Sequence, residues 1–419
     1  MKKIAIVVQR YGAQINGGAE VHARMIAEKL KDKYDITVLT SRAVNYNTWE
    51  PVLPMGDSFE NGVKIIRFDH PPKSDPKEIH LFNRRIRGRR WYQKLYRFLG
   101  KPAWYLRLIP QTIVKEGQDE NKFFELQGPA LFKLPDYLVK HESEYICYIF
   151  FTYLYYPTAI GMPLVSQKSI FIPTIHDEPP VYFPVFKKII PVARWIFFNT
   201  DSEKKFSERL FNIENNKKDT VAVGINPVVY INDDTIEKKY TSLKSYILYV
   251  GRIDYAKGCD KLIEYFINYY NTNKNNISLI MVGNNYMNKI DHPNIHYLGF
   301  VSENEKAYLM KNALFLVIPS IYESLSLVLL ESFFIKTPVL VNEKCEVLKE
   351  HVSKSGGGLS FSDYDQFREA VDFFKNSTDL RSQMGIKGYQ YVLDNYCWDT
   401  VIQKFDMAIH DIETNNKFS

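Results

Sequence analysis

Two glutamates flank an apolar run in a pattern that suits the binding of hydroxyl groups. Glu323 and Glu331 lie in the segment PSIYESLSLVLLES, and the residues between them are mostly apolar. A carboxylate on an apolar helix face needs hydrogen-bond donors, because burying an unpaired charge is costly. Ribose or hexose hydroxyls would supply these donors. The structural alternative is that Glu323 interacts with the positive N-terminal end of the helix dipole and that Glu331 forms a salt bridge. The N–H groups of Ser324, Leu325 and Ser326 could face an anion outside the helix start.

Two cations precede these carboxylates in the segment VGRIDYAKGCDKLIEYF. Arg252 and Lys257 follow a predicted strand that ends at Val250, and a helix is predicted to begin near Lys257. Open parallel sheets bind ligands at the carboxyl ends of their strands. A bidentate guanidinium and a point-charge ammonium together suit a diphosphate. A pair of solvated loop cations is the alternative.

The first half of the chain offers weaker candidates. Gly17 and Gly18 lie between the first predicted strand and the first predicted helix. The glycines could let backbone N–H groups approach a phosphate, or they could serve a tight turn whose backbone has a positive φ. His176 follows a predicted strand in IPTIHDEPP and is either catalytic or structural. No D-x-D is placed to hold a metal, and the four cysteines have no ligand spacing. We therefore expect neither a metal nor another cofactor.

These residues require a two-domain scaffold, because 419 residues exceed one ordinary core. Apolar runs that alternate with amphipathic helices predict βαβ units and parallel sheets. Strands are predicted at 4–8, 35–40, 145–151, 169–175, 194–200, 245–251, 277–283, near 294–298 and 314–318, and at 338–342, with helices at 18–31, 257–271 and 323–335. We predict an N-terminal domain at 1–229, a polar, irregular linker at 230–244, a second domain at 245–395, and a C-terminal helix at 396–419 that returns to the first domain.

A basic segment from about 79 to 115 interrupts the first domain. It holds ten basic residues and no acidic ones, so the rest of the chain, with 44 basic and 48 acidic side chains, has a formal net charge of −4. Aromatic residues are interleaved, which suits contact with an anionic membrane surface. A solvated face is the alternative, and nucleic acid is not expected as a partner because no nucleic-acid motif accompanies the segment. The membrane-side candidates are Arg84, Arg85, Arg87, Arg89, Arg90 and Trp91.

Two apolar stretches bear on localisation. The run Ile4–Val8 is short and is followed by Gln9, which favours a buried strand over a secretion signal. Tyr145–Val165 contains two prolines and is too interrupted for a spanning helix. We expect a cytoplasmic protein at the inner face of the plasma membrane.

The motifs together resemble the retaining glycosyltransferases of family 4, which have the GT-B fold of two Rossmann-like domains. GRIDYAKG, the E-x7-E pair and the glycine pair after the first strand carry this resemblance, which covers the chain except the basic segment. FNTDSEKKFSERL, LGFVSENEKAYLMKNALFLVIPS and RSQMGIKGYQYVLDNYCWDTVIQKFDMAI extend it. RYG, GGAEVHARMIAEKL, FFTYLYYPT and HDEPP resemble a bacterial branch associated with surface polysaccharide assembly.

The resemblance implies a hexosyltransferase that uses a nucleotide-sugar and a glycan or lipid-linked acceptor. Arg252 and Lys257 would neutralise the donor diphosphate, Glu331 would bind ribose hydroxyls, and Glu323 would hold the transferred sugar. The remaining implied residues are His176 near the reacting centre, Gly17 and Gly18 beside the phosphate, and Gly283, Phe300, Val301, Ser324, Leu325 and Ser326 around the donor. The family often has glycine where this chain has Ser326, which bears on the fit of the donor sugar.

The sequence disfavours three other functions. A GT-B-like epimerase needs no acceptor surface, so the basic, aromatic segment counts against it. A catalytically silent binding protein would be expected to lose Arg252, Lys257 and Glu331, and all three are present. An NAD-dependent enzyme is disfavoured because no G-x-G-x-x-G follows the first strand.

Overall fold

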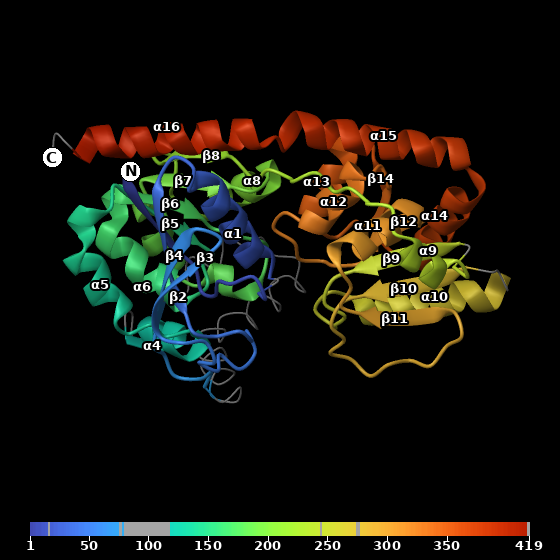
Figure 1. Ribbon diagram of the computed structural model, residues 1–419, viewed down its shortest axis with the longest axis horizontal. Coiled ribbons are helices and arrows are strands. Elements are labelled where there is room, and N and C mark those ends of the chain that lie inside the picture. The colour runs from blue at the N-terminus through green and yellow to red at the C-terminus, as the bar shows by residue number, and fades with distance from the viewer. Residues whose placement is uncertain (16, 75–77, 79–117, 244, 274–276, 417–419) are drawn as a thin grey trace, which may run out of the picture. The chain divides into compact units, whose positions relative to one another are not determined.

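The computed structural model describes residues 1–15, 17–74, 78, 118–243, 245–273 and 277–416, which form two compact units (Figure 1). Unit 1 consists of Met1–Phe198, Lys204–Val221 and Lys404–Ser419, and unit 2 consists of Asn199–Glu203 and Ala222–Gln403. Each unit has its own sheet of mainly parallel strands. The predicted α/β architecture with two Rossmann-like bodies is confirmed.

Unit 1 contains a sheet in the order β3-β4-β2-β1-β5-β6-β7-β8, in which only β3 and β4 pair antiparallel. The described strands are β1 (Lys3–Val7), β2 (Asp35–Ser41), β3 (Gly56–Glu60), β4 (Val63–Phe68), β5 (Cys147–Phe151), β6 (Ser169–Ile172), β7 (Trp195–Phe198) and β8 (Lys217–Thr220). The α-helices are α1 (Gly18–Leu30), α4 (Gln118–Gln127), α5 (Leu134–Lys140), α6 (Tyr156–Gly161), α7 (Phe186–Ile189), α8 (Asp201–Leu210) and α16 (Trp398–Asn416), of which α8 and α16 cross the unit boundary.

Unit 2 contains an all-parallel sheet in the order β11-β10-β9-β12-β13-β14. Its strands are β9 (Tyr246–Val250), β10 (Ser278–Val282), β11 (Ile295–Gly299), β12 (Phe315–Ile318), β13 (Val339–Asn342) and β14 (Gly358–Phe361). Its helices are α9 (Asp234–Tyr240), α10 (Cys259–Asn273), α11 (Glu303–Asn312), α12 (Leu327–Phe334), α13 (Glu346–Ser355), α14 (Tyr364–Asn376) and α15 (Thr378–Asn395).

The central strands of both sheets are buried, as their continuous apolar sequences predict. Every residue of β5 is buried, and so are the first four residues of β9. Parallel strands covered by helices on both faces need continuous apolar runs of this kind. The burial holds the strands rigid, so the loops at their carboxyl ends start from fixed positions.

Three features differ from the sequence-based prediction. The segment 230–244, predicted to be irregular, contains α9, whose N-terminus is capped by Asp233 accepting from the N–H groups of Thr235 and Ile236. The strands β3, β4, β8 and β14 were not predicted, since they are short and partly polar or only partly buried. The helix predicted at 323–335 begins only at Leu327, because Ser324–Ser326 form part of the preceding turn.

The basic segment falls outside the described residues, and so do Arg84, Arg85, Arg87, Arg89, Arg90 and Trp91. Among the helices that the structure does describe, none has the length and apolar character needed to cross a membrane.

Candidate functional site

The sheet of unit 2 has a topological switch at β9, because the chain runs from β9 outward to β10 on one side and later returns to β12 on the other. Loops that leave neighbouring strands in opposite directions open a crevice at the carboxyl edge of such a sheet. Residues 251–258 follow β9 and residues 319–326 follow β12. These two loops carry Arg252, Lys257 and Glu323, so the fold brings the strongest sequence candidates to one place.

Lys257 and Glu323 form an ion pair across this switch. The Nζ of Lys257 lies 2.6 Å from Oε1 of Glu323, and the side chains are 25% and 16% exposed. Arg252 joins them through Asp254, whose carboxylate lies 3.6 Å from Nη1 of Arg252 and accepts the N–H of Lys257 at 2.8 Å. The arrangement holds two cations near the sheet edge beside one partly exposed carboxylate. A diphosphate could bind the cations, and a sugar hydroxyl could donate to Glu323.

Glycines allow the backbone around these cations to pack closely. Gly283 has a φ of 128°, and a Cβ there would lie 2.0 Å from the carbonyl oxygen of Gly251. Gly258 has a φ of 74°, and a Cβ there would lie 2.8 Å from the carbonyl oxygen of Pro319. The β9 loop therefore touches both the β10 loop and the β12 loop only because these positions lack side chains. This packing gives Gly283 a structural role beside its predicted donor-binding role.

Ser326 is the N-cap of α12 and adopts a left-handed backbone, with φ 64° and ψ 72°. The resemblance stated above has glycine at this position, and the left-handed conformation explains why glycine suits it. The Ser326 hydroxyl does not cap the helix, and its oxygen is buried without a hydrogen-bond partner among the described residues. The first N–H groups of α12 thus come from Leu327 onward, not from Ser324–Ser326 as the longer predicted helix required.

Glu331 lies further along α12 and binds a different cation. Its Oε2 lies 3.0 Å from Nζ of Lys306 on α11, and Lys306 also pairs with Glu303 at 2.7 Å. Burial raises the pKa of Glu331, and Lys306 offsets part of that rise. Burial acts to lower the pKa of Lys306, but Glu331 and Glu303 raise it above its ordinary value. Lys306 is a candidate site residue that sequence reasoning missed, because the packing of α11 beside α12 brings it to Glu331.

Phe300 and Val301 connect β11 to α11. Phe300 is 65% exposed, whereas Val301 is partly buried. An exposed aromatic side chain at the end of this partly buried strand is available to stack on a planar ring.

In unit 1, the glycine pair lies at the start of α1, with Gly17 as its N-cap. The φ of Gly17 is −76°, and Gly18 has no positive φ either, so no left-handed turn explains the pair. A Cβ at Gly17 would collide with Glu20, whose Oε1 accepts from Nε and Nη2 of Arg10 at 2.8 and 2.5 Å. A Cβ at Gly18 would meet nothing within 4 Å. Gly17 therefore makes room for a buried ion pair, and the space at Gly18 leaves its backbone approachable.

His176 follows β6 and lies beside a carboxylate. Its Nε2 is 3.4 Å from Oε1 of Glu178, and the hydroxyl of Tyr153 donates to the same oxygen at 2.5 Å. Burial acts to raise the pKa of Glu178, but His176 and Tyr153 outweigh it and hold the pKa below its ordinary value. A charged Glu178 can orient the imidazole of His176 by accepting a hydrogen bond from it.

Within the described ranges, no group of three or more His, Cys, Asp or Glu side chains is arranged to hold a metal ion.

Comparison with known proteins gives a family match in the second half of the chain. Residues 232–391 match the family model "Glycosyl transferases group 1". An uncharacterized glycosyltransferase of Methanocaldococcus jannaschii is 27% identical over 225 residues, which are 48% of this chain and 56% of that protein. The match thus spans a little more than half of the length of that curated relative.

Solved structures resemble the whole chain. A sucrose-phosphate synthase from Thermosynechococcus elongatus has a TM-score of 0.70 at 15% identity and covers 99% of this chain and 100% of its own. Anabaena HepE, solved in complex with UDP and glucose, has a TM-score of 0.66 at 12% identity over 98% and 100% of the chains. WaaG, a glycosyltransferase involved in lipopolysaccharide biosynthesis, has a TM-score of 0.62 at 14% identity over 97% and 99%.

At these identities the structural likeness establishes the fold. The chain has the GT-B fold of two Rossmann-like units, and its residues 232–391 match the group 1 glycosyl transferases.

Proposed function

We propose that the chain is a glycosyltransferase that moves a sugar from a nucleotide-sugar donor to an acceptor hydroxyl, with retention at the anomeric carbon. The observation that carries the proposal is the meeting of Lys257 and Glu323 across the switch of unit 2, with Arg252 linked through Asp254. The matched family and the UDP complex of the neighbour HepE support a nucleotide-sugar donor.

The chemistry follows from these side chains. As the glycosidic bond to the leaving diphosphate breaks, negative charge grows on the phosphate oxygens, and Arg252 and Lys257 would stabilise it. Lys257 would exchange or share its contact with Glu323 when the diphosphate arrives, which frees the carboxylate to accept from the transferred sugar. Glu331, Phe300 and Val301 would hold the nucleoside. In unit 1, the backbone of Gly18 would approach the phosphate. His176, whose imidazole is oriented by Glu178, would lie near the reacting centre.

Leaving-group stabilisation by fixed cations needs no metal ion in this proposal. A nucleotide-sugar epimerase would use the same cations on the donor alone, and a silent binding protein would bind the donor without turnover. The two alternatives predict no new glycosidic bond.

The acceptor is proposed to be a lipid-linked glycan of cell-surface polysaccharide, presented at the inner face of the plasma membrane. The basic, aromatic composition of residues 79–115 supports contact with anionic lipid, since each basic residue near such a surface is worth about 1 kcal/mol. The contact should be strongly salt-dependent.

Product analysis tests the transferase proposal. The protein is incubated with UDP-, GDP-, ADP- and dTDP-sugars and with membrane lipid extract as acceptor, and the anomeric configuration of any product is read by NMR. A new α-linkage from an α-linked donor is expected. Conversion of the donor into its epimer would favour the epimerase, and binding of a donor without turnover would favour the silent binding protein.

A separate experiment tests the membrane contact. Liposomes with anionic lipid should sediment the wild type at low salt, and replacing Arg84, Arg85, Arg87, Arg89 and Arg90 by Glu should abolish this while nucleotide affinity stays unchanged. A wild-type protein that remains in the supernatant would contradict the membrane contact alone.

A further inference from the structure

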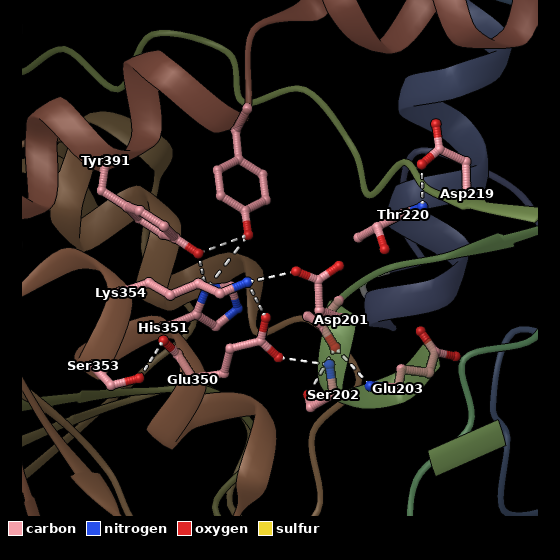
Figure 2. A network of polar contacts seen from close by, with 12 residues as sticks. Asp201, Ser202, Glu203, Asp219, Thr220, Glu350, His351, Ser353, Lys354 and Tyr391 are labelled. Carbon is pink, nitrogen blue, oxygen red and sulfur yellow. Dashed lines mark hydrogen bonds and ion pairs between the residues drawn. The ribbon is translucent and has the colours of Figure 1, made fainter. Parts of the chain in front are cut away.

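His351 lies at the centre of a buried polar network in unit 2 (Figure 2). It belongs to α13, is 1% exposed, and uses both ring nitrogens. Nε2 lies 2.8 Å from the carbonyl oxygen of Leu325, and Nδ1 lies 3.0 Å from the hydroxyl of Tyr391. A carbonyl oxygen can only accept, so Nε2 carries the proton and donates it, while Nδ1 accepts from the tyrosine. Burial lowers the pKa of His351 to about 4, which keeps the ring in this neutral form.

The carbonyl that His351 binds lies at a strained point of the candidate donor loop, residues 323–326. Leu325 directly precedes Ser326, whose left-handed backbone is uncommon for a residue other than glycine. Such a conformation persists where neighbouring contacts hold it. The hydrogen bond from His351 restrains the peptide unit that joins Leu325 to Ser326, and this unit sets the direction in which the chain enters α12.

The helix that carries His351 is itself anchored on both sides. Glu350 accepts the N–H of Ser202 at 2.7 Å, and Lys354 pairs with Glu350 at 2.6 Å and with Asp201 at 2.7 Å. Burial acts to raise the pKa of Glu350, but its bonds to Lys354 and Ser202 outweigh this and hold it below the ordinary value. On the other side, the hydroxyls of Tyr391 and Tyr396 lie 3.0 and 3.4 Å from Nδ1 of His351.

We propose that His351 is a positioning residue for the donor loop 323–326, and that it acts through the carbonyl of Leu325. The proposal rests on the proposed function to the extent that this loop binds the donor. The ring links α13 and α15 to the turn that carries Glu323 and begins α12. A loop released from this link would sample other conformations, and Glu323 would lose its fixed position beside Lys257.

Two substitutions separate positioning from packing. In H351Q the side-chain amide can still reach the position of Nε2 and donate to Leu325, but the acceptor for Tyr391 is lost. In H351N the amide oxygen can still accept near Nδ1, but the donor to Leu325 is lost. Both variants remove the ring from the same buried space, so both should lower the melting temperature.

The experiment measures affinity and hydrogen exchange in wild type, H351Q and H351N. Titration calorimetry uses the nucleoside diphosphate, among UDP, GDP, ADP and dTDP, that wild type binds best. H351N should bind it about tenfold more weakly, the value of one lost hydrogen bond, and H351Q should stay within about threefold of wild type. Amide exchange in residues 323–328 should be faster in H351N than in H351Q. Equal affinities and equal exchange in the two variants would overturn the proposal.

The two readouts also distinguish this proposal from the proposed function. If wild type binds none of the four nucleotides, the donor assignment fails, whereas the exchange comparison still decides whether His351 restrains the loop. If H351N does not fold, H351L replaces it: leucine fills much of the same buried space but cannot donate to the carbonyl of Leu325, so exchange in 323–328 should be faster than in H351Q, and equal exchange in the two variants would overturn the proposal.

Discussion

Acid is expected to destabilise unit 2 through the protonation of His351. The pKa of this imidazole is about 4 in the folded chain, because of burial, and near its ordinary value of 6.5 when the chain is unfolded. Between these pH values the unfolded state binds the additional proton, so the free energy of unfolding falls as the pH falls. The contribution of His351 is fully present above about pH 6.5 and is lost by about pH 4.

The size of the effect follows from the two pKa values. Each pH unit between them changes the free energy of unfolding by at most about 1.4 kcal/mol, so the whole interval amounts to about 3 kcal/mol. Domains are usually stable by only about 5–15 kcal/mol, so this one group is a substantial part of the total.

Hydrogen exchange in α13 and α15 measures this contribution without mixing in the unfolding of unit 1. Exchange rates, corrected for their intrinsic pH dependence, are recorded for wild type and H351Q from about pH 7 to about pH 4.5. H351Q should be less stable at neutral pH, and the gap should close toward acid pH because glutamine does not titrate. Parallel curves for the two proteins, or an NMR titration of His351 near its ordinary pKa, would refute the reasoning.

Three further predictions concern the donor site. E331Q and K306M should each weaken nucleoside diphosphate binding about tenfold in calorimetry, because each breaks the same ion pair. E323Q should reduce turnover of the intact sugar donor more than it reduces binding of the bare nucleotide. Identical binding and turnover profiles for E331Q and E323Q would argue against separate roles. Transfer should survive EDTA, and a loss of activity that Mg²⁺ or Mn²⁺ restores would contradict the metal-free proposal. S326G should raise the free energy of unfolding by about 1 kcal/mol in urea titrations, because glycine adopts the left-handed backbone without strain; an unchanged or lower stability would speak against strain at this residue.

The sequence predicted the central strands to within a few residues because a parallel strand covered on both faces is a continuous apolar run. The run SYILYVG, for example, was predicted as a strand and contains β9. The helix α9 was missed because its residues are mostly polar; its signal was Asp233, a residue type favoured at helix N-caps. Short edge strands such as β3 carry too few apolar residues to be recognised.

The candidate site could also be predicted only in part. Arg252, Lys257 and Glu323 could be placed together through the family resemblance, and the structure has them on the loops after the neighbouring parallel strands β9 and β12. The pairing of Glu331 with Lys306 could not, since it depends on how α11 packs beside α12. His351 gave no signal either: a single histidine in an amphipathic helix is ordinary, and only the hydrogen bond to Leu325 distinguishes it. The roles assigned to these residues stay predictions.

The central claim is that the β9 and β12 loops of unit 2 bind the diphosphate of a nucleotide-sugar. The most direct measurement is titration calorimetry of UDP, GDP, ADP and dTDP against wild type, R252A and K257A, with K261A on the exposed face of α10 as the matched control. Wild type and K261A should bind one nucleotide equally well, and R252A and K257A should each bind it about ten- to a hundredfold more weakly, as expected for a lost charged hydrogen bond. Unchanged affinity in both R252A and K257A would contradict the claim.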